Sequence, residues 1–248
     1  FFTKTLRSGF LNQGNFVSLS PRYYWVRGIE ARASQGVNLG ATHHEIGIGY
    51  RYIDEASHEL RYRESTASGQ LPTVSSRNDR DTRGKTEAHA VYLDDRIDWG
   101  LWTITPGVRY ERIDQQQINV LTGRPFKGDY STALPALNVL YRLDEGWNLY
   151  ANTEGSFGSV QYSQMPNRVR QGLVKPEKAR TWEFGTRYDQ GVLRAEIGAF
   201  LINFNNQYDS SQITDSVIAR GKTRHAGIES SFGYRLDEQI GRASCRER

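Results

Sequence analysis

Apolar and polar residues alternate along most of the chain. In EIGIGYRY (45–52) every second residue is isoleucine or tyrosine, and the residues between them are glutamate, glycine and arginine. The same period of two recurs in WTITPGVRY (102–110), WNLYANTE (147–154), LRAEIGAFL (193–201) and GIESSFGY (227–234). Successive side chains of a β-strand point to opposite faces, so this pattern predicts strands with one apolar and one polar face. No segment of comparable length has the pattern of an amphipathic helix.

Short and long connections alternate between the predicted strands. The stretches DWG (98–100), DEG (144–146) and DQG (189–191) predict tight hairpins. Long polar connections are expected at roughly 54–86, 113–133, 157–178 and 205–222. This asymmetry is typical of outer-membrane barrels, which have short periplasmic turns and long extracellular loops.

Placing the tight turns in the periplasm gives each strand a direction. Segment 21–33 then runs down, 43–53 up, 88–98 down and 101–112 up, with the last strand at 223–235. Aromatic residues gather at strand ends, among them Trp99, Trp102, Trp147, Trp182 and Tyr188. Such girdles are expected at the two membrane interfaces. The fold class predicted is therefore all-β: an antiparallel transmembrane β-barrel segment of about ten strands, part of a larger barrel. Cross-strand aromatic pairing in a soluble sandwich is the alternative.

Charge and hydropathy narrow the function classes. The 32 basic residues are interspersed with 28 acidic ones and the net charge is only +4, which argues against a nucleic-acid partner. The sequence has no apolar run of the length that a transmembrane helix needs. A mean hydropathy of −0.66 fits barrel strands, whose two faces average to a polar value.

Neither end of the sequence resembles a natural terminus. FFTKTLRSGF (1–10) lacks the pattern of a signal peptide. The last stretch, IGRASCRER (240–248), abandons the alternation and could be encoded by a sequencing-adapter end read through in frame. We therefore expect a partial barrel domain over residues 1–239 and a non-native tail over 240–248. Cys245, the single cysteine, then says nothing about redox compartment.

Several stretches resemble one receptor family. VKPEKARTWEFGTRYD (174–189) is similar to a signature in the barrels of TonB-dependent outer-membrane receptors. SPRYYWVRGIE (20–30) and SSRNDRDTRGKTEAHAVYLDD (75–95) resemble the ferric citrate transporters of that family. The resemblance covers roughly residues 1–236. It implies a larger, 22-stranded barrel in the Gram-negative outer membrane, surrounded by lipid. It also implies a plug domain, coupled to TonB, that we expect to lie outside this sequence together with the last strands.

The resemblance further implies that four residues bind ferric citrate: Arg7, Arg22, Arg80 and Gln212. The predicted topology places all four on the extracellular side, with Arg80 and Gln212 in long loops. Guanidinium groups offer planar paired donors to carboxylates. Citrate already ligates the iron, so we expect no protein iron ligand, no cofactor and no enzymatic activity.

Other residues are weaker candidates for a binding or catalytic role. Adjacent strand residues point to opposite faces, so His43 and His44 cannot form a metal pair, and His58 and His89 are expected to stand alone. Asp94 and Asp95 indicate charge near an interface rather than an acid–base pair. Around Arg80, we expect these residues to hold the loop's shape and balance its charge: Arg77, Asp79, Asp81 and Arg83.

Two alternatives remain open at the level of sequence. The first is a related receptor for another anionic ferric chelate. The second is a soluble all-β carbohydrate-binding or adhesive module.

Overall fold

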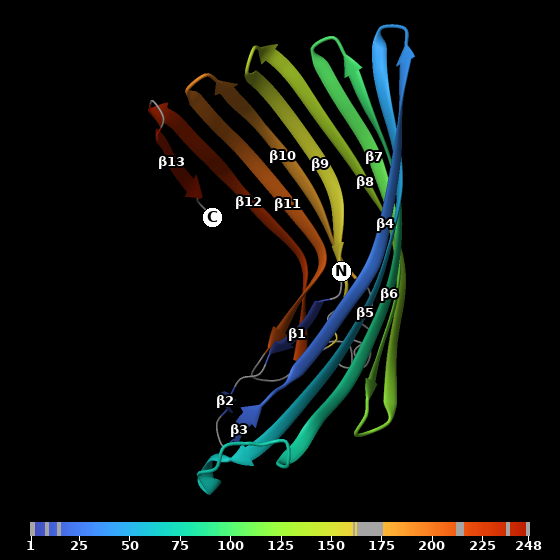
Figure 1. Cartoon of the computed structure of the whole chain (residues 1–248), viewed down its shortest axis with the longest axis vertical. Coiled ribbons are helices and arrows are strands. Elements are labelled where there is room, and N and C mark those ends of the chain that lie inside the picture. Colours follow the sequence, from blue (N-terminus) through green and yellow to red (C-terminus); the bar gives the residue numbers. More distant parts are fainter. Residues whose placement is uncertain are drawn as a thin grey trace.

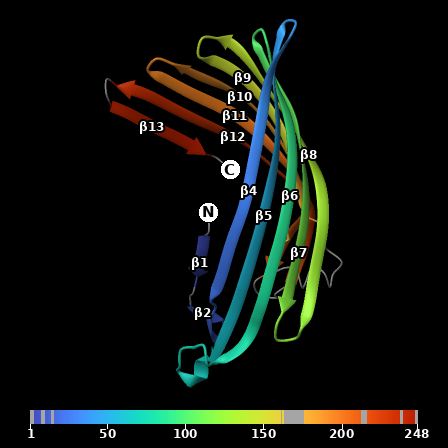
Figure 2. The same cartoon turned by 45° about the vertical axis from the view of Figure 1, so that its right-hand side comes forward.

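The computed structural model describes residues 3–7, 10–13, 16–160, 162, 176–211, 216–236 and 239–246. They form one curved, 13-stranded antiparallel sheet that is open along two edges (Figures 1 and 2). The strands are β1 (Thr3–Arg7), β2 (Phe10–Gln13), β3 (Phe16–Leu19), β4 (Arg22–Leu39), β5 (Thr42–Ser65), β6 (Arg77–Trp99), β7 (Trp102–Asn119), β8 (Arg124–Asp144), β9 (Trp147–Gly158), β10 (Glu177–Gln190), β11 (Leu193–Ser211), β12 (Ser216–Leu236) and β13 (Gln239–Arg246). From β4 to β13 each strand pairs with the next in the chain, β1 pairs with β4, and β3 pairs with β2 and β5. One short 3-10 helix, η1 (Thr66–Ser68), follows β5.

The predicted Asp-x-Gly turns are confirmed. Gly100, Gly146 and Gly191 have φ values of 58°, 78° and 60°, a left-handed conformation that favours glycine. These turns join β6 to β7, β8 to β9 and β10 to β11, and they lie at the same end of the sheet (top of Figure 1). We refer to this end as the tight-turn end.

The prediction of long loops at the opposite end is wrong for three of the four connections. β5 continues to Ser65 and β6 begins at Arg77, so the predicted connection 54–86 shrinks to 66–76. The predicted connection 113–133 shrinks to 120–123. β11 continues to Ser211 and β12 begins at Ser216, so the predicted connection 205–222 shrinks to 212–215. Where both faces of a strand carry polar residues, the contrast between faces disappears while the backbone ladder continues.

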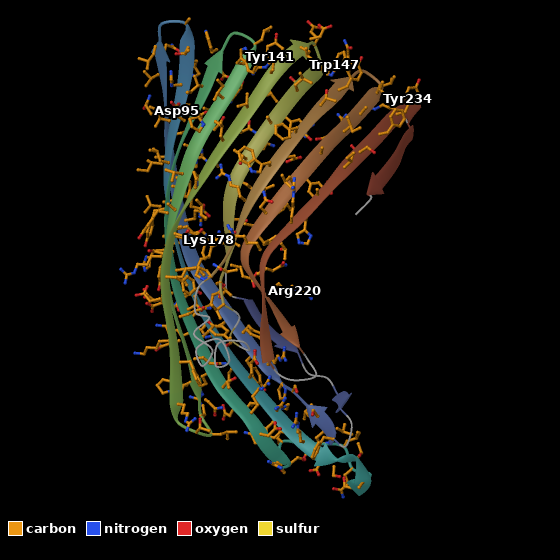
Figure 3. All side chains as sticks on the ribbon, turned by 180° about the vertical axis from the view of Figure 1, so that it is seen from behind. Asp95, Tyr141, Trp147, Lys178, Arg220 and Tyr234 are labelled. Carbon is orange, nitrogen blue, oxygen red and sulfur yellow. The ribbon has the colours of Figure 1, made fainter. Side chains whose placement is uncertain are left out.

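The outward face carries an apolar belt. Ile48, Phe184 and Ile228 on this face are 56%, 57% and 61% exposed, which suits contact with lipid rather than water. Aromatic side chains gather near the tight-turn end, where Tyr141 and Trp147 are labelled in Figure 3 and where the Trp102 and Tyr141 rings lie 4.5 Å apart. Within the described residues, no helix is long and apolar enough to cross a membrane.

An ion pair marks the end of the apolar belt away from the tight turns. Arg27 Nη2 lies 2.7 Å from Asp54 Oδ2, directly across from it in the β4–β5 ladder. On β5, Ile48 and Tyr50 precede Asp54 on the same face. Residues farther from the tight turns than this pair, including Arg22 and Tyr24, therefore lie beyond the belt.

The inward face holds the segment that follows β9. Gln115 Nε2 donates to the Val160 carbonyl oxygen at 2.9 Å, and the Val160 amide donates to the Tyr130 hydroxyl at 3.3 Å. Ile113, Tyr130 and Val160 form a small buried cluster. The chain therefore turns back onto the polar wall of the sheet after leaving β9.

The predicted tail lies mostly in β13, which pairs with β12 from Glu229 to Leu236. Strand pairing does not test the origin of residues 240–248, so their non-native origin stays a prediction.

Candidate functional site

The strand register places two of the predicted arginines in one row. Arg7 ends β1 directly opposite Arg22, the first residue of β4, and Arg22 lies opposite Glu59 of β5. Glu59 in turn lies opposite Thr82 of β6. Residues opposite one another in an antiparallel ladder share a face. The row runs across four strands at the end of the sheet away from the tight turns, as the sequence predicted for Arg7 and Arg22.

Tyr24 connects this row to Glu59. Its hydroxyl donates to Glu59 Oε1 at 2.8 Å, and the Glu59 side chain is only 7% exposed. Burial and the hydrogen bond to Glu59 raise the pKa of Tyr24 above its ordinary value. The hydroxyl therefore remains a donor at neutral pH and keeps the Glu59 carboxylate in place.

Arg80 lies in β6, which corrects the prediction that it belongs to a loop. Its backbone pairs with that of Arg61, and its Nη1 lies 3.9 Å from Glu59 Oε2. Both faces of β6 carry polar residues in this stretch, so no alternation of apolar and polar residues indicated a strand. The register places Arg80 two residues from Thr82 on β6, so three predicted arginines converge on one area of the sheet.

Aspartates near Arg80 are paired across the strands. Asp79 Oδ1 accepts from Arg61 Nε at 2.7 Å, and Asp79 Oδ2 lies 2.9 Å from Arg63 Nη1. Asp81 Oδ1 lies 2.9 Å from His58 Nε2. Asp79 therefore balances the charge of two arginines, along a strand rather than in a loop. The same role for Arg77, Asp81 and Arg83 stays a prediction.

Gln212, the fourth predicted residue, lies outside the described residues. β11 ends at Ser211 and β12 begins at Ser216, and these two residues are paired. Ser211 and Ser216 lie at the end of the sheet opposite the tight turns. Binding by Gln212 and by the three arginines stays a prediction at this point.

The histidines have neighbours that the sequence did not reveal. His58, expected to stand alone, contacts Asp81, and His89 Nδ1 lies 2.7 Å from the Tyr50 hydroxyl. His44 Nδ1 lies 2.8 Å from Asp95 Oδ2. Among the described residues, no group of three or more His, Cys, Asp or Glu side chains could hold a metal ion.

Three residues of this area were missed by sequence reasoning: Tyr24, Glu59 and Arg61. Glu59 and Arg61 fall in the stretch assigned to a loop, so their alternation was not given weight. The signal that could have found them is the spacing of Glu59, Arg61 and Arg63, which continues the period of two of β5.

A separate hollow lies nearer the middle of the inward face. Its volume is about 340 Å³, and its walls come from β5, β6, β7, β8 and β9. The charged side chains that line it include Arg51, Glu55, Arg109 and Glu111, of which Arg109 and Glu111 form an ion pair. Neither Arg22 nor Arg80 lines it. The arginine row is thus a surface distinct from this hollow.

Comparisons with known proteins give one family. The model of the family described as "TonB dependent receptor-like, beta-barrel" matches residues 2–244. The ferrioxamine B receptor of Salmonella typhimurium (strain SL1344) is 25% identical over 218 residues, which cover 82% of this chain and 30% of that receptor. The chain thus spans about a third of the length of this relative.

Comparison with solved structures points to the same kind of receptor. The crystal structure of the ferric citrate transporter FecA in the unliganded form is 63% identical, with a TM-score of 0.87, over 94% of this chain and 35% of that one. The siderophore receptor PiuA from Acinetobacter baumannii shares the fold at 16% identity and a TM-score of 0.70, over 93% of this chain and 40% of that one. These matches argue against the alternative of a soluble all-β module. They confirm the predicted barrel segment.

Proposed function

Because the chain belongs to the TonB-dependent receptor β-barrel family, we propose that it is part of an outer-membrane receptor that binds and imports ferric citrate. The likeness to FecA at 63% identity supports this substrate, and the arginine row provides a surface suited to it. Relatives in this family are barrels of the Gram-negative outer membrane, and we place this chain there.

The charges of the row suit an anionic chelate. Arg7 and Arg22 lie opposite each other, and Arg80 lies on the neighbouring β6. Guanidinium groups stay charged and form paired hydrogen bonds with carboxylates. Citrate carboxylates would meet these groups while citrate itself ligates the iron, so the protein supplies no iron ligand and no cofactor.

Uptake is gated and involves no bond making. The chelate binds at the extracellular end of the barrel, and energy delivered by TonB through the plug of the complete receptor opens a path. The chain spans 35% of the FecA chain, so these steps concern a receptor larger than the chain described. The observation that carries the proposal is the convergence of Arg7, Arg22 and Arg80 on one end of the sheet.

Binding of radiolabelled ferric citrate to outer membranes that carry the complete receptor tests the proposal. Arg80→Ala removes charge-assisted hydrogen bonds of about 1.5–3 kcal/mol, which corresponds to a loss of affinity of roughly 10- to 100-fold. Arg83→Ala is the matched control, because Arg83 is an exposed arginine of the same strand on the opposite face. Unchanged ferric citrate affinity in Arg80→Ala would contradict the proposal.

Another anionic ferric chelate is the alternative substrate. The curated relative at 25% identity is a receptor named for a different chelate, ferrioxamine B. Competition decides between the candidates: excess ferric citrate should displace any other ferric chelate from the receptor. If another chelate binds more tightly and requires Arg80, the citrate assignment fails.

A further inference from the structure

Two arginines face each other at the extracellular end of β5 and β6. Arg61 and Arg80 are direct partners in the ladder, and their side chains are only 21% and 23% exposed. Like charges directly opposite each other destabilise a sheet, and partial burial strengthens their repulsion. Such a pair needs negative charge beside it.

Two carboxylates flank the arginine pair. Asp79 accepts from Arg61 Nε at 2.7 Å, and Glu59 lies 3.9 Å from Arg80 Nη1. The bond to Asp79 uses the Nε edge of Arg61. The structure gives the two Nη atoms of Arg61 no partner among the described side chains. Asp79 therefore fixes the plane of this guanidinium and leaves its terminal donors for another acceptor.

Arg63 has a different environment from Arg61. It also pairs with Asp79, at 2.9 Å, but its guanidinium carbon lies 5.6 Å from the centre of the Phe16 ring on β3. This cation–π contact packs the Arg63 side chain against the first residue of β3. Arg63 thus packs a neighbouring strand, whereas Arg61 lies opposite Arg80.

The local charge favours an anion. The described side chains of this area include four arginines (Arg22, Arg61, Arg63 and Arg80) and two carboxylates (Glu59 and Asp79). Positive charge therefore exceeds negative charge within this set. The hydrogen bond from the Tyr24 hydroxyl also holds the Glu59 carboxylate in place.

We propose that Arg61 and Arg80 form a two-arginine subsite that takes one carboxylate group of an anionic ferric chelate. The inference rests on the proposed function and adds Arg61 as a residue that touches the substrate. Asp79 is a positioning residue, since it orients the guanidinium of Arg61, and Glu59 supplies negative charge 3.9 Å from Arg80 Nη1. A carboxylate between the two arginines also relieves the repulsion between them.

The test measures dissociation constants for ferric citrate, and for citrate without iron, at several salt concentrations on the complete receptor. Arg61→Ala should weaken ferric citrate binding about tenfold or more and make affinity less dependent on salt, because one cationic contact is lost. Arg61→Lys keeps the charge and should recover only part of the affinity. Arg63→Ala is the matched control and should change affinity less than about twofold.

A double variant tests whether the two arginines share one group. If they hold the same carboxylate, Arg61→Ala combined with Arg80→Ala loses less affinity than the product of the single losses. Multiplicative losses, or equal effects of Arg61→Ala and Arg63→Ala, overturn the subsite. Asp79→Asn leaves both arginines in place and should lower affinity by a smaller factor. This variant decides the question if Arg61→Ala fails to fold.

The outcomes separate the inference from the proposed function. If Arg80→Ala weakens ferric citrate binding and Arg61→Ala does not, the two-arginine subsite is overturned and the proposed function stands. If citrate without iron binds in a manner that depends on Arg61 while ferric citrate does not bind, the subsite stands and the proposed function fails. If the receptor binds neither ligand, both are overturned.

Discussion

Tyr24 is the residue that joins the row of predicted arginines to a buried carboxylate. It is two residues from Arg22 on β4, and its hydroxyl donates to Glu59. Arg22 opposes the rise in the pKa of Tyr24, but burial and Glu59 dominate. The position of the Glu59 carboxylate beside the arginines therefore depends on a neutral residue. Counting charged residues along the sequence would not identify it.

The Tyr24 phenol should ionise at a higher pH than an ordinary tyrosine. Since the pKa is raised in the folded protein, the stabilising contribution of Tyr24 is fully present below the ordinary pKa of 10.0. It is lost as pH rises through the raised pKa. The measurement is the difference in ultraviolet absorbance between the complete receptor and its Tyr24→Phe variant during an alkaline titration. A difference that titrates at or below pH 10 would show that Glu59 does not hold this hydroxyl.

At the scale of elements, the long strands do two things that shorter strands could not. β5 and β6 extend past the apolar belt and carry Glu59, Arg61 and Arg80 on paired ladder positions, next to a shift of register that follows Arg61. β7 and β8 extend likewise and carry Gln115 and Tyr130, which bind the segment after β9. The charged residues at the end away from the tight turns are thus carried by strands, which position side chains more rigidly than loops do.

Gln115 should be needed to hold the segment after β9. Gln115→Ala leaves the Val160 carbonyl without its donor, and an unsatisfied buried group costs about 1–3 kcal/mol. Amide hydrogen exchange in Ser159 and Val160 should become faster. Gln116→Ala, on the exposed opposite face of the same strand, is the control and should leave exchange unchanged. Equal exchange in the two variants would mean that other contacts hold the segment.

At the scale of the whole molecule, the sheet is a curved wall with two open edges. β1 lies at one edge and β13 at the other, and the outward face exposes large apolar side chains. Unpaired strand edges and an exposed apolar face promote association in water. We therefore expect this chain, taken alone in water, to associate through its edges and its outward face.

The isolated 248-residue chain should aggregate in detergent-free buffer. Its edges lack partners, and its belt has no lipid to cover it. Analytical sedimentation of the refolded chain, with and without detergent, checks this. The complete receptor in detergent is the control and should sediment as a single species. A monodisperse, folded monomer without detergent would contradict the membrane assignment of the outward face.

The sequence by itself determined the alternation of faces, the aromatic residues near the tight-turn end and the tight turns at Gly100, Gly146 and Gly191. These features are local, because side-chain period and left-handed glycines depend on neighbouring residues alone. It also placed Arg7 and Arg22 at the correct end of the sheet.

Only the tertiary structure decided where strands end and which residues face each other. Period two fades where both faces are hydrated, so the strand that carries Arg80 could not be recognised from its pattern. Register arises from hydrogen bonds between strands that are distant in sequence, and these bonds place Arg22 opposite Glu59 and Arg61 opposite Arg80. Residue types and periodicity therefore determined the barrel wall, whereas long-range pairing assembled the group of charges on it.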